Sequence, residues 1–121
     1  MKNDERVKQV VEETYRQNSR KRHLLDVLAI LSTVEGRRFI IELLEVCRVF
    51  RNNWTPSAEI HRFEGMRHIG LTMLRDIEDL GIKGLELYHT AQKEYISLQL
   101  EEERQRGVDI AKLTKEENKR A

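Results

Sequence analysis

The chain has 121 residues, and its 22 Lys and Arg against 21 Asp and Glu give a net charge of +1, with 36% of the residues charged. This length suits one domain with a modest core, and the near-neutral total argues against binding to nucleic acid by electrostatics alone. No apolar run approaches the roughly 20 residues of a membrane span, and the charged start from Met1 to Arg6 does not resemble a secretory signal. We therefore expect one compact unit that acts inside the cell that makes it. The single Cys47 excludes an internal disulfide, and its apolar neighbours predict a buried thiol.

The pattern predicts an all-α protein, a small bundle of about four helices, because proline occurs once and no segment alternates with period two. A first, polar helix is expected from about Asp4 to about Arg20. The basic tract from Arg16 to Arg22 is interpreted as a linker, an anion-binding patch or the polar end of this helix. The predicted division is residues 1–22 as N-terminal helix and basic linker, 23–100 as helical core domain, and 101–121 as charged C-terminal extension.

A second, short helix from about Leu24 to Leu31 is apolar enough to require burial. Ser32 and Glu35 have the spacing of a capping box and predict the start of the next helix. Its expected inward residues are Phe39, Ile40, Leu43, Leu44, Val46 and Cys47. Gly36, in the first turn, indicates close approach of another backbone, which we favour, or access of an anion to the helix start.

The loop from Arg51 to Ser57 has turn-forming asparagines, and Thr55 or Ser57 is the expected cap of the following helix. Trp54 within this loop is either a lid over the core or an exposed anchor for a partner. A helix from about Ser57 to Leu80 follows, with Arg67 on its apolar seam. The Arg67 guanidinium must therefore reach solvent, pair with an acid such as Glu64 or Glu42, or face another subunit. The expected seam consists of Ile60, Phe63, Gly70, Leu74 and Ile77, flanked by Met66, Ile69, Met73 and Leu80.

Gly81 is expected to end this helix with a left-handed residue, and Gly84 to open the last helix. The inward stripe of the last helix is predicted to be Leu85, Tyr88, Ala91, Tyr95 and Leu98. Beyond Gly107 the few apolar residues suffice only for a short amphipathic segment, which we expect to be mobile in the isolated protein.

From Thr33 to Ile77 the chain contains seven arginines and no lysine. Because a guanidinium makes fixed bidentate contacts to carboxylate or phosphate, this bias predicts a binding surface rather than a catalytic cleft. The candidate partner-binding residues are Arg37, Arg38, Arg51, Trp54, Arg62 and Arg67. The candidate nucleic-acid contacts are Arg16, Arg20, Lys21 and Arg22. The segment 33–75 carries a net +2 and the segment 76–103 a net −6, which permits head-to-tail contact between copies or an arrangement within one chain.

Residues that could support catalysis or metal binding lack the required spacing. His61, Glu64 and His68 do not match the metallohydrolase motif, and Asp76 with Asp79 is interpreted as a solvated acidic face. Cys47 has no predicted histidine partner. We therefore predict a protein that is not an enzyme and that has no metal and no cofactor.

Four strings in conserved order carry a family resemblance. They are Leu31-Ser32-Thr33-Val34-Glu35-Gly36-Arg37-Arg38-Phe39, Leu43-Leu44-Glu45-Val46-Cys47-Arg48-Val49-Phe50, Phe63-Glu64-Gly65-Met66-Arg67-His68-Ile69-Gly70-Leu71 and Leu85-Glu86-Leu87-Tyr88. Over roughly Leu24 to Glu94 the chain resembles the Bbp-nineteen-like phage domain, a family of small proteins of tailed bacteriophages. The resemblance implies a role in the virion or its assembly, located in the host cytoplasm during assembly and then in the particle.

Three functions follow as expectations. The first is a virion-associated or assembly protein, of capsid, portal–tail connector or ejected type, that contacts phage structural proteins as a homo-oligomer. The second is a nucleic-acid-binding packaging or regulatory factor. The third is an early inhibitor of a host protein, acting as a stable monomer with Trp54 exposed.

Overall fold

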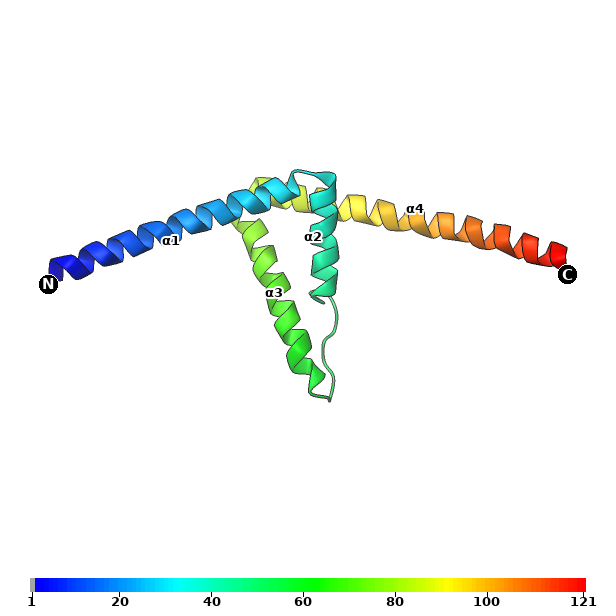
Figure 1. The fold of residues 1–121 in the computed structure, drawn as a ribbon, viewed down its shortest axis with the longest axis horizontal. Coiled ribbons are helices and arrows are strands. Elements are labelled where there is room, and N and C mark those ends of the chain that lie inside the picture. The colour runs from blue at the N-terminus through cyan, green and yellow to red at the C-terminus, as the bar shows by residue number, and fades with distance from the viewer. Residues whose placement is uncertain (1) are drawn as a thin grey trace.

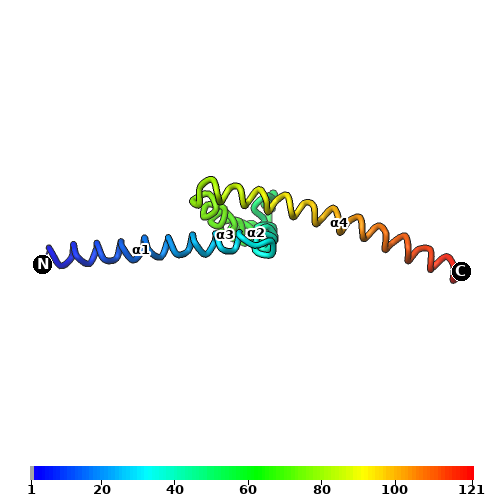
Figure 2. The backbone as a smooth tube through the Cα atoms, turned by 90° about the horizontal axis from the view of Figure 1, so that it is seen from above, coloured from blue at the N-terminus to red at the C-terminus, as the bar shows by residue number. Residues whose placement is uncertain are grey.

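The computed structural model describes residues 2–121 and is an all-α fold of four helices (Figure 1). The helices are α1 (Lys2–Leu31), α2 (Val34–Val46), α3 (Glu59–Asp79) and α4 (Ile82–Arg120). Helices α2 and α3 form a hairpin that projects from the place where α1 and α4 pass each other, and its tip is the connection 47–58 (Figure 1). The two long helices leave this body in opposite directions, as both views show (Figures 1 and 2). We call residues 2–19 the N-terminal arm and residues 99–120 the C-terminal arm.

The core lies where all four helices meet. Leu31, Leu44 and Ile77 are fully buried, and each belongs to a different helix. Ala91 on α4 and Cys47 at the end of α2 are also buried, so the predicted buried thiol is confirmed. All buried and half-buried residues among those described lie between Leu24 and Leu98. The rest of α1 and α4 is exposed along its whole length.

The first two predicted helices are a single helix in the structure. Helix α1 continues through residues 16–22 and across the expected boundary at residue 23, so the linker interpretation is wrong. This tract contains neither glycine nor proline, and Arg and Lys are good helix formers, so its charge gives no reason for a break. The apolar segment from Leu24 to Leu31, at the end of α1, is only partly buried: Val27 and Leu31 are buried, whereas Leu25 is exposed.

Helix α2 begins one residue later than the capping-box spacing indicated. Thr33 is the N-cap, and its Oγ1 accepts a hydrogen bond from the Gly36 amide at 3.0 Å. The Ser32 hydroxyl instead donates to the Leu28 carbonyl oxygen of α1 at 2.7 Å. The inward set was also partly wrong, since Phe39 and Val46 are exposed and Ile41 is buried.

Two glycines allow backbones to approach closely. A Cβ on Gly36 would lie 1.8 Å from the Ile30 carbonyl oxygen, which confirms the predicted backbone contact. A Cβ on Gly84 would lie 2.3 Å from the Ile77 carbonyl oxygen, at the corner between α3 and α4. Gly81 has φ +75°, so the predicted positive-φ residue after α3 is confirmed.

Helices α3 and α4 follow the predicted stripes with two differences. Ile69 lies on the exposed side of α3, and Leu85 is more exposed than the rest of the α4 stripe. Helix α4 begins at Ile82 rather than at Gly84, and it continues through Gly107 to Arg120. The segment expected to be mobile is therefore the helical end of α4.

Candidate partner-binding surface

The tip of the hairpin is organised around Arg48, a residue that the sequence did not single out. Arg48 has φ +58°, a left-handed conformation that non-glycine residues seldom adopt. Its Nε donates to the Asn53 Oδ1 at 2.9 Å, and the buried Asn53 Nδ2 donates back to the Arg48 carbonyl oxygen at 3.2 Å. The Arg48 guanidinium also lies 4.0 Å from the centre of the Phe63 ring on α3, within cation–π range. These contacts fix the side chain before any partner binds.

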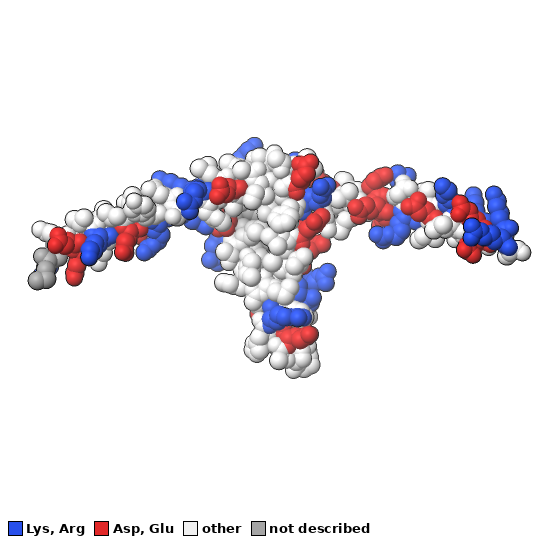
Figure 3. All heavy atoms as spheres, viewed as in Figure 1, with Lys and Arg blue, Asp and Glu red and all other residues white. Residues whose placement is uncertain are grey.

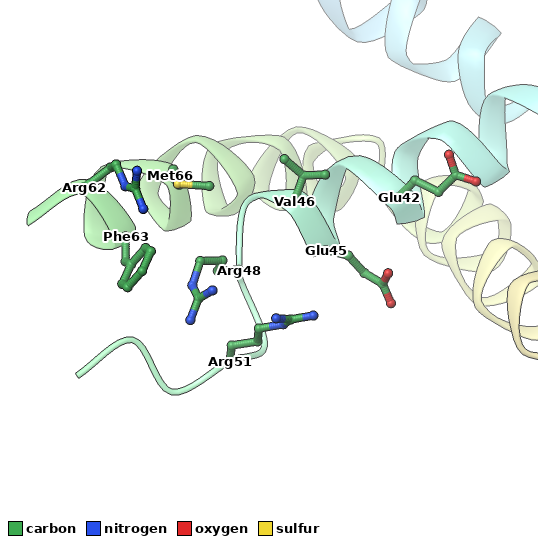
Figure 4. Close-up of a pocket in the computed structure, with 8 residues that line it drawn as sticks. All are labelled: Glu42, Glu45, Val46, Arg48, Arg51, Arg62, Phe63 and Met66. Carbon is green, nitrogen blue, oxygen red and sulfur yellow. The ribbon is translucent and has the colours of Figure 1, made fainter. Parts of the chain in front are cut away.

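A groove of about 600 Å³ opens beside Arg48, between the end of α2 and the start of α3 (Figure 4). Arg48, Arg51 and Arg62 line its end near the tip, and Val46, Phe63 and Met66 supply apolar surface. Glu42 and Glu45 line the opposite end, nearer the body (Figure 4). We call this the tip groove; Phe63 and Met66 lie beside Arg62 toward the tip, Arg48 and Arg51 follow, and the glutamates lie toward the body (Figure 4).

Two of the predicted partner-binding arginines lie in the tip groove. Arg51 makes no ion pair with any residue in the range 2–121, and Arg62 makes only a 3.6 Å pair with its neighbour Glu59. Trp54 follows Arg51 in the tip connection and is 72% exposed, so the lid interpretation is wrong and the exposed alternative holds. These three side chains are free to contact a partner.

Arg37 is removed from the candidate surface because its guanidinium is used within the chain. It forms an ion pair with Glu94 of α4 at 2.9 Å and donates to the Leu31 carbonyl oxygen at 3.0 Å. The Arg37 side chain is only 12% exposed. It therefore joins the end of α1 and the start of α2 to α4.

Arg67 and Arg38 lie outside the tip groove. The Arg67 guanidinium is 3.9 Å from Glu64, one turn earlier on α3, and the side chain is 41% exposed. The pairing with Glu64 that the sequence suggested is thus present, although an exposed pair at this distance stabilises little. Arg38 borders a separate cavity of about 340 Å³ between α2 and α4, together with Tyr95 and Leu98.

The predicted nucleic-acid contacts do not form one patch. Arg20 donates to Asp76 at 2.6 Å and to Asp79 at 2.5 Å, which ties α1 to α3. Arg16 pairs with Glu13 on the same helix, whereas Lys21 and Arg22 form no ion pair within the described chain. Two of the four candidate residues are therefore engaged within the protein.

The carboxylate of Asp76 is the centre of the α1–α3 contact. It also accepts a hydrogen bond from His23 Nε2 at 2.7 Å. Burial alone raises the pKa of the Asp76 carboxyl, but the hydrogen bonds from His23 and Arg20 outweigh it and hold this pKa below its usual value. Conversely, the hydrogen bonds to Asp76 and Asp79 raise the pKa of Arg20. The acidic pair that the sequence indicated to be a solvated face is thus a structural contact.

Both long helices also carry apolar residues on the side that faces away from the body. At 100° per residue, the exposed Ile82, Ile96, Leu100 and Ile110 of α4 fall within an arc of about 80°. That arc lies opposite the packed Ala91. We call it the α4 outer stripe. On α1 the exposed Val7, Val11 and Leu25 are aligned in the same way, within about 40°.

The surface view shows how charge is distributed around these features. Lys, Arg, Asp and Glu are intermixed on both arms, while much of the body on the face shown is uncharged, with positive side chains near the tip (Figure 3). Within residues 2–121 no helix is long and apolar enough to cross a membrane. The same residues contain no group of three or more His, Cys, Asp or Glu side chains placed to hold a metal ion.

Comparisons with protein-family models, curated proteins and solved structures give no match to this chain. Its candidate surface is therefore defined by its own geometry. That geometry consists of the tip groove, the exposed Trp54 in the tip connection, and the apolar stripes on the outer sides of α1 and α4.

Proposed function

We propose that this chain is a non-enzymatic assembly protein that binds other protein subunits, including copies of itself, through its helical surfaces. The α4 outer stripe is the observation that carries the proposal. Ile82 and Ile96 lie on the part of α4 whose other side packs in the body, and Leu100 and Ile110 continue the stripe along the exposed C-terminal arm. One copy of the chain leaves all four side chains in water, and burying them against another subunit is favourable.

The kind of assembly that we propose is a bacteriophage particle, as a virion-associated or assembly protein. The support for this is the resemblance of residues 24–94 to the Bbp-nineteen-like phage domain. Two motif residues of that resemblance, Gly36 and Gly70, have structural reasons in this fold, because a side chain at either would clash with a neighbouring segment. The motif residues thus belong to the packed body, which this chain would share with the phage domain. The exposed stripes and the tip groove would supply the contacts to phage structural proteins.

The stripe is tested by placing charge on it. In the double variant Ile96→Glu with Leu100→Glu, two carboxylates would have to be buried at any contact made by the stripe, which is costly. We expect the wild-type chain to be larger than its monomer mass of 14.4 kDa by light scattering behind a sizing column, and the double variant to be a monomer. Thr90→Glu with Ser97→Glu adds the same charge to exposed sites of α4 outside the stripe and should leave the mass unchanged.

One result would contradict the proposal. A wild-type chain that remains a monomer at every concentration would show that the stripe does not hold copies together. Circular dichroism verifies that the double variant keeps its helicity, so that a change in mass reports the contact and not damage to the fold. The same runs with duplex DNA test the nucleic-acid alternative, which requires a shift in mass that disappears as salt is raised.

The exposed Trp54 favours a second candidate function, inhibition of a host protein by a monomer. Tryptophan is enriched among the residues that dominate binding energy at interfaces, and this side chain is open to solvent in the isolated chain. A wild-type chain that is a monomer and whose mass does not change with duplex DNA would favour this candidate over the assembly role. Its Trp54 emission should then shift to shorter wavelength when the partner binds.

A further inference from the structure

The tip groove has a charge pattern that restricts what can bind in it. Phe63 and Met66 lie with Arg62 toward the tip, Arg48 and Arg51 come next, and Glu45 and Glu42 lie toward the body (Figure 4). A ligand that satisfies the whole groove must carry apolar surface, acidic groups and basic groups in that order. A phosphate backbone does not fit, because it would meet the two glutamates with charge of the same sign.

The basic end of the groove is prepared for carboxylates. Arg48 is held by Asn53 and by the Phe63 ring, so little side-chain freedom is lost when it binds an anion. Arg51 has no ion pair within the described residues, and the Arg62–Glu59 pair is exposed and weak. At least two of these guanidinium groups are therefore available for bidentate contacts to carboxylates.

The C-terminal arm of the same chain carries the matching sequence of groups. Glu101, Glu102 and Glu103 are followed at once by Arg104 and Arg106, and all five are exposed. Leu100 and Glu103 lie within about 60° of each other on the arm, which places apolar and acidic groups on one side. The basic tract of α1, residues 16–22, would be repelled by the arginines.

We infer that the tip groove binds residues 100–106 of the C-terminal arm of a second copy of this chain. In this contact Glu102 and Glu103 meet the arginines at the tip, and Arg104 and Arg106 lie toward Glu42 and Glu45. The inference rests on the proposed assembly function and names the contact that links one copy to the next.

The contact is between copies because an arm cannot reach its own groove. Helix α4 is continuous from Ile82 to Arg120, and the C-terminal arm leaves the body away from the hairpin tip (Figures 1 and 2). A groove on one copy and an arm on the next are different surfaces, so the contact is head-to-tail. Such contacts build a closed ring or an open filament, according to the rotation between copies.

Charge reversal on each side tests the inference. The groove variant is Arg51→Glu with Arg62→Glu, and the arm variant is Glu102→Arg with Glu103→Arg; all four side chains are exposed in a single copy. Each variant alone should associate at least about tenfold more weakly than wild type, because like charges then face each other. Sedimentation velocity measures the change, and circular dichroism verifies that both variants remain folded.

Mixing the two variants gives the decisive measurement. In an equal mixture the acidic arm of the groove variant meets the basic groove of the arm variant, and the basic arm of the arm variant meets the acidic groove of the groove variant. The mixture should therefore assemble as the wild type does, with the two chains alternating. The chain with all four reversals should recover the wild-type assembly. Glu116→Arg with Glu117→Arg applies the same charge change further along the same arm and should behave as wild type.

The outcomes separate this inference from the proposed function. If the groove and arm variants assemble as wild type while the Ile96→Glu with Leu100→Glu variant does not, the inference is overturned and the assembly function stands. A mixture that remains monomeric also overturns it. A wild-type monomer overturns both. Binding of duplex DNA that the groove variant loses and the arm variant keeps would assign the groove to nucleic acid instead.

Discussion

Gly65 and Gly70 lie five residues apart on α3 and share one sequence motif, but their surroundings differ. A Cβ on Gly70 would lie 2.2 Å from Cγ2 of Val49 and 2.9 Å from Cβ of Cys47. A Cβ on Gly65 would meet nothing within 4 Å. The chain after α2 crosses α3 at Gly70, so only this glycine is required by packing.

This difference predicts opposite effects of the same substitution. Gly70→Ala should lower the free energy of unfolding by about 1–3 kcal/mol, because the added methyl group displaces buried neighbours. Gly65→Ala should raise it by up to about 1 kcal/mol, because alanine is the better helix former at an open site. Urea unfolding followed by circular dichroism measures both. Equal changes in the two variants would contradict the packing that the structure shows around Gly70.

Single residues also show what the sequence could and could not reveal at this scale. The packing role of Gly36 and the buried state of Cys47 followed from local pattern, and both are confirmed. The partner of Arg37 is Glu94, 57 positions away, and helical periodicity carries no signal for such a pair. Arg48 was missed for the same reason, since its ring partner Phe63 belongs to another helix.

Among the elements, α1 and α3 are joined by a charged contact rather than by apolar packing alone. Arg20 and His23 of α1 both bond to the buried Asp76 of α3. A sequence-based division that ended the first unit at residue 22 separated these two residues. Helical periodicity predicted the number and order of packed segments well, but the basic tract concealed the continuity of α1, because charge patterning does not distinguish a linker from an exposed helix.

The α1–α3 contact predicts how stability depends on pH. The pKa of Asp76 is lower in the folded chain than in the unfolded chain, so its contribution is complete above the ordinary aspartate pKa of about 4 and is lost as the pH falls below that value. Asp76→Asn should therefore be less stable by about 1–2 kcal/mol at neutral pH and show a shallower loss in acid. Thermal unfolding between pH 7 and pH 3 gives both quantities.

The neighbouring Asp79→Asn variant is the matched control. The Asp79 side chain is 48% exposed and accepts only the second bond from Arg20, so its loss should cost less at neutral pH. If Asp76→Asn kept the acid sensitivity of the wild type, the charged contact would not be its source.

The whole molecule consists of a small body and two arms whose described residues are all exposed in one copy. All residues from Gln99 to the end of α4 are exposed, as are those from Lys2 to His23. A solitary helix of this length is only marginally stable in water, since most helical stability in proteins comes from packing. The mobility that the sequence predicted for the end of the chain stays a prediction for the isolated copy, in which these residues form the helical end of α4.

The arms should exchange their amide hydrogens much faster than the body. In the isolated chain at low concentration, we expect amides of residues 2–19 and 103–120 to exchange within seconds and those of residues 27–31 and 77–91 to be protected by most of the global unfolding free energy. Hydrogen exchange with mass spectrometry measures this. Protection of the C-terminal arm that rises with protein concentration would report its burial by another copy, whereas strong protection at the lowest concentration would contradict the isolated-arm description.

The length of the C-terminal arm has a geometrical consequence for any structure built from this chain. Twenty-two helical residues extend about 33 Å. Residues 100–106 are the first turns of this arm, so a neighbour bound there stands close to the body, and residues 107–120 project about 21 Å beyond the contact. Each junction between copies therefore leaves a helical end exposed on its far side, where a further subunit can bind without displacing either copy.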